Sequence, residues 1–288
     1  MIEFPSLKEE DAQTYLLPPD PSYDALIETV ESFYQDWGRS FVFRDRHDPY
    51  SVLLSEVMLQ QTQTSRVVEK YRYFLSRWPS FKALAHAPLE EILIAWKGLG
   101  YNRRALNLKK TAEKTEAWNW TIPNDHKAML TLPGVGKATA AALLAFCYQE
   151  KSIYLETNIR RVLLYYYFHD QTDVHDRVLE AILAKIIVLV DDPRSWYYAL
   201  MDYGVLLKAL VPNPNTKSAH YAKQSRFEGS KRQVRAALLH HIAEHGPVSL
   251  PAVSSMLREY DSKYLDQSIE ELLKEGFLLL REGYLSIR

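Results

Sequence analysis

Two glutamates stand in apolar surroundings, where a carboxyl group can take part in acid–base chemistry. The first, Glu56, lies in "LLSEVMLQQT". If this segment is a helix, Val52, Glu56, Gln60 and Gln63 share one stripe on its surface. Partial burial disfavours the charged form and raises the pKa of a carboxyl toward that of a useful general acid. A structural glutamate with satisfied hydrogen bonds fits the same pattern, so these residues alone leave both interpretations open.

The second carboxylate, Glu156, lies in "SIYLETNIRRVLLYYYF", between a short apolar run and an amphipathic segment that looks helical. It fits a surface turn, the N-cap of a helix over 158–168, or one half of an active site. Thr157 alone is able to cap that helix, so capping does not require Glu156.

The stretch "LTLPGVGKATAAALLAF" at 130–146 predicts a helical hairpin. One helix ends near Leu132, Gly134 and Gly136 permit a tight turn, and Lys137 opens an alanine-rich helix. Backbone amides of the turn and of the new helix then point the same way, which suits an anion such as a phosphate. A lone Gly-Val-Gly is most often only a turn.

The elements that carry these residues are predicted to be helical almost throughout. Apolar residues recur mostly at spacings of three and four, beginning with helical stretches near 23–37 and 51–62. Short breaks at "RWPS", "HAPLEE", "KGLGYN", "IPNDH" and "LPGVG" separate the helices that follow. The fold class is therefore all-α.

After the linker "FEGS" at 227–230, the pattern changes to three helices followed by two short strands around Glu282-Gly283. This is the order of elements in a winged helix, and also fits a three-helix packing module without a ligand. Residues 229–288 hold eight basic and eight acidic side chains, so charge does not favour DNA here.

Composition narrows the class of protein. The chain has 288 residues, a net charge of −1 and one cysteine, Cys147, which excludes a disulfide framework and an all-cysteine metal site. The start is acidic and no apolar run reaches the ~18 residues of a membrane span. We expect a soluble cytoplasmic monomer without membrane contact, nucleoid-associated if bacterial.

Charge is unevenly distributed along the chain. Residues 97–137 hold eight Lys or Arg against three acids, and residues 208–235 hold seven against one. Basic segments of this kind are typical of a surface that binds a polyanion, although solvated helix surface gives the same pattern.

Five motifs in one order resemble the helix-hairpin-helix DNA glycosylases, above all the adenine glycosylase branch. They are "GRSFVFRDRHDPYSVLLSEVMLQQTQT", "AWKGLGYNRRALNL", "LPGVGKATAAAL", "ETNIRRV" and "ALMDYG". The resemblance covers about residues 38–228 and implies a two-lobed, all-α enzyme with its site between the lobes. We expect a glycosylase domain at 1–228, with a six-helix lobe at about 45–155 and a second lobe from 22–44 and 156–228. A winged-helix-like domain then occupies 229–288.

The resemblance also implies roles for the two glutamates. Removal of a base needs an acid that helps the base leave and a carboxylate that stabilises an oxocarbenium-like sugar. Glu56 takes the place of the acid, and Asn158 steadies the sugar side. Glu156 stands where the family has Asp. Its extra methylene moves the carboxylate by about 1.5 Å on an unchanged backbone, which can cost ~100-fold in rate.

The other expected site residues contact DNA. By the same resemblance, Gln60 and Gln61 face base edges or fill the gap left by a flipped nucleotide, and Tyr101 is an aromatic wedge. The family often has a second tyrosine where this chain has Asn102. The residues expected to bind DNA at the hairpin are Gly134, Val135, Gly136, Lys137 and Thr139.

Several family features are absent from the sequence. Ala138 stands where bifunctional members have a lysine nucleophile, so we expect no strong strand-cleaving lyase activity. Positions that bind an iron–sulfur cluster in many relatives are Lys208, Asn215, Ser218 and Gln224. None is a thiolate, so we expect no cluster and no other cofactor, with the hairpin as a candidate site for a monovalent cation. Only about 60 residues follow Gly229, too few for the Nudix-like domain that reads 8-oxoguanine in adenine glycosylases.

The sequence therefore predicts a monofunctional glycosylase of base excision repair that acts on mismatched or damaged duplex DNA. Adenine opposite 8-oxoguanine or guanine is the favoured target. One alternative is a glycosylase for uracil, mispaired thymine or another lesion on the same scaffold. The other is a DNA-damage-binding protein in which Glu156 has attenuated catalysis.

Overall fold

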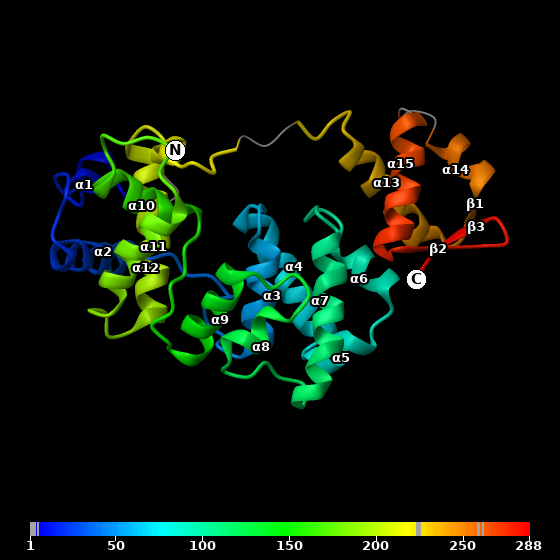
Figure 1. Cartoon of the computed structure of the whole chain (residues 1–288), viewed down its shortest axis with the longest axis horizontal. Coiled ribbons are helices and arrows are strands. Elements are labelled where there is room, and N and C mark those ends of the chain that lie inside the picture. Colours follow the sequence, from blue (N-terminus) through cyan, green and yellow to red (C-terminus); the bar gives the residue numbers. More distant parts are fainter. Residues whose placement is uncertain (1–3, 5, 223–225, 258–259, 261) are drawn as a thin grey trace. The chain divides into compact units, whose positions relative to one another are not determined.

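The computed structural model describes residues 4, 6–222, 226–257, 260 and 262–288, and they are mostly helical (Figure 1). The all-α fold class is thereby confirmed. The chain forms two compact units. Unit 1 contains the described residues of Met1–Val52, Asn124–Thr131 and Val135–Lys223; unit 2 contains those of Leu53–Pro123, Leu132–Gly134 and Gln224–Arg288. Among the described residues, no helix has both the length and the apolar character that crossing a bilayer demands.

Unit 1 is built around α12 (Pro193–Leu210), which packs against α2, α9 and α10. Asp192 caps the start of α12 by accepting hydrogen bonds from the amides of Arg194 and Ser195, and Pro193 takes the first helical position. The other helices of this unit are α1 (Glu9–Gln13), α2 (Tyr23–Trp37), α8 (His126–Leu130), α9 (Lys137–Tyr148), α10 (Thr157–Tyr167), α11 (Asp176–Ile187) and the 3₁₀ helix η2 (Pro214–Lys217).

Unit 2 begins within α3 (Pro49–Leu59), whose first residues belong to unit 1. In this unit α5 and α6 pack against α7, and α13 packs against α6. Its other helices are α4 (Thr64–Arg77), α5 (Phe81–His86), α6 (Leu89–Trp96), α7 (Arg103–Lys114), the 3₁₀ helix η1 (Thr115–Trp118), α13 (Lys231–His245), α14 (Leu250–Met256) and α15 (Ser262–Glu275).

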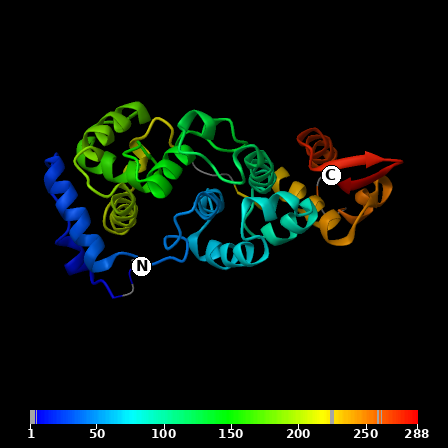
Figure 2. The ribbon, with the colours of Figure 1, turned by 90° about the horizontal axis from the view of Figure 1, so that it is seen from below.

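The C-terminal part of unit 2 contains the three predicted helices and the predicted hairpin. Strands β2 (Leu278–Arg281) and β3 (Tyr284–Ile287) pair antiparallel, seen as adjoining red arrows in Figure 2. A two-residue strand that the sequence did not predict, β1 (Val248–Ser249), pairs with β3 and gives the order β1-β3-β2. The winged-helix assignment and the domain boundary at residue 228 stay predictions.

A buried ion-pair network explains two of the sequence motifs. Asp202, from "ALMDYG", is fully buried in α12. It accepts hydrogen bonds from the guanidinium groups of Arg39 and Arg44, from "GRSFVFRD", at 2.8–3.0 Å, and from the Arg39 amide at 2.8 Å. Burial alone would raise the pKa of Asp202, but the bonds and charges of Arg44 and Arg39 hold that pKa below its ordinary value.

We predict that Asp202→Asn lowers the free energy of unfolding by ~3–5 kcal/mol, because Arg44 is left buried without its counter-charge. In the unchanged protein, this carboxylate contributes stability above the ordinary aspartate pKa of about 3.9. The contribution is lost as the pH falls through the lower folded value. Urea unfolding at neutral and acidic pH measures both effects. Asp45→Asn, at an exposed position, is the matched control; equal stability of the two variants would contradict the prediction.

Candidate functional site

Glu156 is the N-cap residue of α10, and its side chain accepts hydrogen bonds from two amides of that helix. Oε1 lies 2.6 Å from the Asn158 nitrogen and 2.9 Å from the Ile159 nitrogen. The expectation that Thr157 makes this cap unnecessary is wrong. Thr157 is the first helical residue and is exposed, while Glu156 has the extended backbone of a cap (φ −127°, ψ −178°). Its longer side chain still reaches back to the helix start, so the carboxylate is fixed.

The environment of Glu156 pulls its pKa in two directions. Burial raises the pKa of this carboxyl above its ordinary value, against the opposing effects of the two amides and of Arg161 and Arg160. Asn158 donates from Nδ2 to Oε2 at 3.3 Å. These three bonds use three of roughly four lone-pair sites on the carboxylate, so Oε2 retains capacity for one more partner.

The start of α10 is held by contacts from its neighbours. Arg161 donates from Nη1 to the Asn158 Oδ1 and to the Gly204 carbonyl, both at 2.7 Å, which orients the Asn158 amide. A Cβ at Gly204 would lie 2.4 Å from the Asn158 carbonyl oxygen, so a side chain does not fit there. Asn215 donates to the Thr157 carbonyl at 3.2 Å. Glu156 and Asn158 are therefore brought together, as the sequence predicted, on a rigid support.

Glu56 lies on α3, in unit 2, and is half-buried between buried neighbours Ser55 and Val57. The prediction that Val52, Glu56, Gln60 and Gln63 share one helical stripe is wrong for Gln60 and Gln63, because α3 ends at Leu59. Gln60 and Gln61 are exposed loop residues, and Gln61 has a left-handed backbone (φ 55°).

A buried arginine on α7, Arg104, binds backbone carbonyls at the end of α3. The Arg104 side chain donates six hydrogen bonds of 2.7–3.1 Å to two segments. The acceptors are the carbonyls of Val57, Met58, Gln60, Leu99 and Gly100 and the Thr62 hydroxyl. Burial lowers the pKa of Arg104 to about 10, so the group stays a cation at neutral pH. It joins the end of the helix that carries Glu56 to the turn that carries Tyr101.

Tyr101 follows a turn in which Gly98 and Gly100 also have positive φ. Its own φ of 47° is left-handed, which is uncommon for a bulky residue and is found most often where function demands it. The residue is 40% exposed. The backbone thus presents an aromatic face outward, in keeping with the predicted wedge.

The predicted phosphate-binding hairpin forms between α8 and α9. Gly134 has φ 77°, and Gly136 is the N-cap of α9, with no side-chain bond to the first amides. Gly134, Gly136 and Lys137 are exposed, whereas Val135 and Thr139 are buried. Only the first three therefore have the exposure that a phosphate contact needs, and the role of the hairpin stays a prediction.

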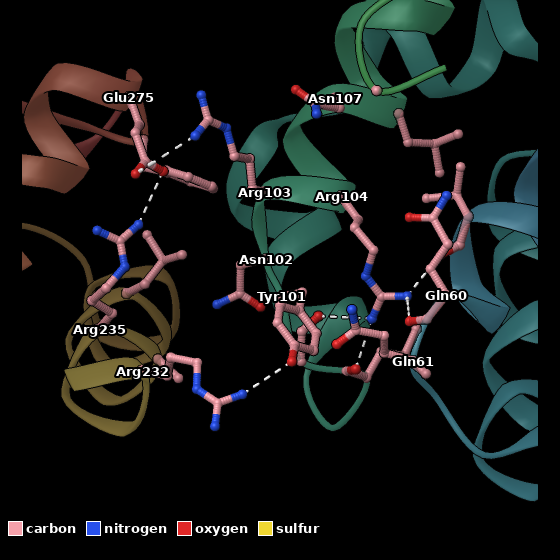
Figure 3. A pocket seen from close by; sticks show the side chains of 18 of the residues that line it. Gln60, Gln61, Tyr101, Asn102, Arg103, Arg104, Asn107, Arg232, Arg235 and Glu275 are labelled. Carbon is pink, nitrogen blue, oxygen red and sulfur yellow. Dashed lines mark hydrogen bonds and ion pairs between the residues drawn. The ribbon is translucent and has the colours of Figure 1, made fainter. Parts of the chain in front are cut away.

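Within unit 2, a cavity of about 1150 Å³ brings Gln60, Gln61 and Tyr101 together (Figure 3). Its other wall comes from α13 and α15. Arg232 donates to the Tyr101 hydroxyl at 3.0 Å, and its guanidinium lies 5.8 Å from the ring centroid. Arg235 pairs with Glu271 and Glu275 at 2.7 and 2.9 Å. The sequence did not single out Arg104, Arg232 or Arg235; their signal was the basic character of two segments.

Three of the four positions that hold an iron–sulfur cluster in relatives lie in the described part, whereas Gln224 lies outside it. Lys208 is exposed on α12, and Asn215 and Ser218 are buried. Ser218 accepts a hydrogen bond from the His220 amide. These side chains do not fit a cluster, which needs thiolates or imidazoles. Asn215 instead supports the start of α10.

Comparison with known proteins gives matches along most of the chain. Residues 54–187 match the model described as "HhH-GPD superfamily base excision DNA repair protein". An adenine DNA glycosylase of Buchnera aphidicola subsp. Baizongia pistaciae is 36% identical over 65% of this chain and 54% of its own length. The chain spans about half the length of the first such relatives. An adenine DNA glycosylase of Mycolicibacterium smegmatis is 30% identical over 80% of this chain and 84% of its own.

The chain belongs to the HhH-GPD superfamily. A solved structure described as a thermostable thymine-DNA glycosylase is 28% identical, with a TM-score of 0.57 over 63% of this chain and 85% of that one. The HhH-GPD match includes Glu56, Tyr101, the hairpin and Glu156. The resemblance inferred from the five motifs is thereby confirmed at the level of the family.

We predict that Arg104→Lys lowers the free energy of unfolding by at least ~2 kcal/mol. A lysine has three donors and no planar fork, so several buried carbonyls lose their partner, at ~1–3 kcal/mol each. Denaturant unfolding measures the loss. The neighbouring Arg103→Lys is the control, because the Arg103 side chain is 68% exposed. A loss no larger than that of the control would show that the fork is not needed.

We predict that Gly204→Ala costs ~1–3 kcal/mol by forcing α10 and α12 apart. The clash is with the backbone of Asn158. Thermal unfolding measures the loss, and an equally stable variant would refute this account of the close approach. Ala209→Gly, at an exposed position near the end of the same helix, controls for changes in helix propensity.

Proposed function

We propose that the protein is a monofunctional DNA glycosylase that removes a mispaired base from duplex DNA, with adenine opposite 8-oxoguanine or guanine as its target. The observation that carries the proposal is the fixed carboxylate of Glu156 at the start of α10, with the Asn158 amide on its second oxygen. The adenine DNA glycosylase of M. smegmatis, aligned over most of both chains, supports the choice of adenine.

In the proposed reaction, Glu56 gives its proton to a ring nitrogen of the flipped adenine. The N-glycosidic bond then breaks and its electron pair leaves with the base. The negative charge of Glu156 stabilises the positive charge that develops on the sugar. Water adds at the sugar carbon and releases a proton, which balances the one given to the base. A fixed position matters for Glu156, because electrostatic stabilisation costs least when the charge need not move.

The proposal includes hydrolysis without strong strand cleavage and without an iron–sulfur cluster. Ala138, in the first turn of α9, has no amine to form a Schiff base with the sugar. Lys137 beside it is exposed and suits a phosphate contact instead. Support for the start of α10 comes from Asn215.

A second candidate is removal of thymine or uracil from a mismatch. It is favoured by the 28% identity and shared fold with the thymine-DNA glycosylase. Duplexes carrying A:8-oxoG, A:G, T:G and U:G, followed by alkaline cleavage of abasic sites, distinguish the two. Product with adenine alone supports the first candidate. Tight binding without any product would favour the alternative, a protein that binds damaged DNA and whose catalysis is attenuated.

We predict that Glu56→Gln abolishes product from the preferred duplex, because an amide is not acidic enough to protonate the base. Glu156→Gln should lower the single-turnover rate by at least ~100-fold through the loss of charge. Glu156→Asp keeps the charge on a shorter side chain and tests the extra methylene. A rate above that of the unchanged protein would mark the glutamate as attenuating; a lower rate would show a site adapted to its length. Retained activity in Glu56→Gln would remove Glu56 from the mechanism.

A further inference from the structure

The cavity beside Tyr101 has the charge of a polyanion site. Seven Lys or Arg side chains line it against two glutamates, an excess of five positive charges. The basic residues are Arg66, Lys97, Arg103, Arg104, Lys231, Arg232 and Arg235. Two of the paired cations, Lys231 and Arg235, share Glu271 as a partner at 2.6 and 2.7 Å, which fixes α13 against α15. Lys97 also pairs with Glu244, and Arg103 lies 4.0 Å from Glu275, so acids hold the wall in place and offset part of its positive charge.

The cavity also offers flat and amide-bearing surfaces that suit nucleotide bases. Tyr101 and Phe227, which is 51% exposed, are among the aromatic residues that line it. Four amide side chains line it, namely Gln60, Gln61, Asn102 and Asn107. Figure 3 shows Arg232 pointing toward the Tyr101 ring from α13. An aromatic ring with a guanidinium beside it, in a basic groove, is how single-stranded nucleic acid is bound.

The cavity, at about 1150 Å³, is as large as the larger pockets that hold small molecules, which are typically ~300–1,000 Å³. It extends from α3 and α7 to α13, as a strand of several nucleotides requires.

Charge within the C-terminal part indicates which helix faces the DNA. In helix-turn-helix proteins, the second helix of the motif enters the major groove. Here that helix would be α15, which holds four acids against two lysines. α13 holds Lys231, Arg232 and Arg235 against one acid, Glu244. Phosphates would therefore repel α15 and attract the start of α13.

From these observations we propose that the groove between the Tyr101 turn and α13 binds a stretch of unpaired DNA strand, with one base stacked at Tyr101 and Arg232. The C-terminal helices thereby form one wall of the DNA site. The inference rests on the DNA substrate of the proposed function and not on base removal.

The test is equilibrium binding of the full chain to two labelled duplexes of undamaged DNA, followed by fluorescence anisotropy. One duplex contains a three-nucleotide bulge and the other is fully paired. Arg232→Ala should weaken binding to the bulged duplex roughly tenfold, the worth of one stacking contact, and change binding to the paired duplex less than twofold. In Arg232→Ala, the slope of log affinity against log salt concentration should decrease in magnitude by about one. Arg232→Lys, which keeps the charge without the planar face, should retain the slope and lose most of the stacking.

Arg281→Ala is the matched control, since it removes an exposed arginine of the same C-terminal part from a strand outside the groove. Unchanged affinity in Arg232→Ala would overturn the proposal. An equal loss of affinity on both duplexes would show that Arg232 contacts only a phosphate. It would then contradict the proposal that a base stacks at Arg232. A gain in affinity would show that α13 covers Tyr101 as a lid, which also overturns it. Because no base is removed in this assay, binding without excision would refute the proposed function and leave this inference intact.

Discussion

A buried cation fixes the geometry of unit 2. Arg104 lies in the protein interior, and the hydrogen bonds described for its guanidinium end on carbonyls and one hydroxyl. Its charge is balanced by the negative ends of backbone dipoles, including the last carbonyls of α3, where the helix dipole is negative. Burying a cation in this way is costly unless its donors have acceptors. Nη1 and Nη2 have theirs on the two segments, whereas Nε has none among the described residues. Arg104 thereby links the end of the helix that carries Glu56 to the turn that precedes Tyr101.

Unit 1 positions its carboxylate by similar means. Arg161 is buried and bonds to a backbone carbonyl and to Asn158, and Glu156 is held by the amides of its own helix. Beneath them, Asp202 and its two arginines hold α12, against which α10 packs. In both units the groups with expected chemistry are anchored to backbone atoms, which move less than side chains.

The sequence predicted the helices and the hairpin, because periodicity and glycine are local signals. It placed Glu156 beside Asn158 through the resemblance to a family, and it assigned the cap to Thr157 instead of Glu156. It did not predict that α3 ends at Leu59, or that the carbonyls at this end bind Arg104, forty-five positions beyond Leu59. The wall supplied by Arg232 likewise depends on contacts between residues more than a hundred positions apart. A basic residue in the sequence does not show whether it faces solvent, an acid or a cavity.

The order of the segments along the chain has a consequence for biosynthesis. Unit 2 is built from Leu53–Pro123, the short segment Leu132–Gly134 and the described residues of Gln224–Arg288, with most of unit 1 between the first and the last. On a ribosome, the Tyr101 turn therefore emerges long before α13 and α15, which complete its cavity. Arg104 already has its acceptors by then, so the turn can form early while its basic wall is still missing. Nascent chains should therefore pass through a stage in which the Tyr101 turn has formed and α13 does not yet cover it. Apolar surface stays exposed during this stage and favours aggregation until synthesis ends.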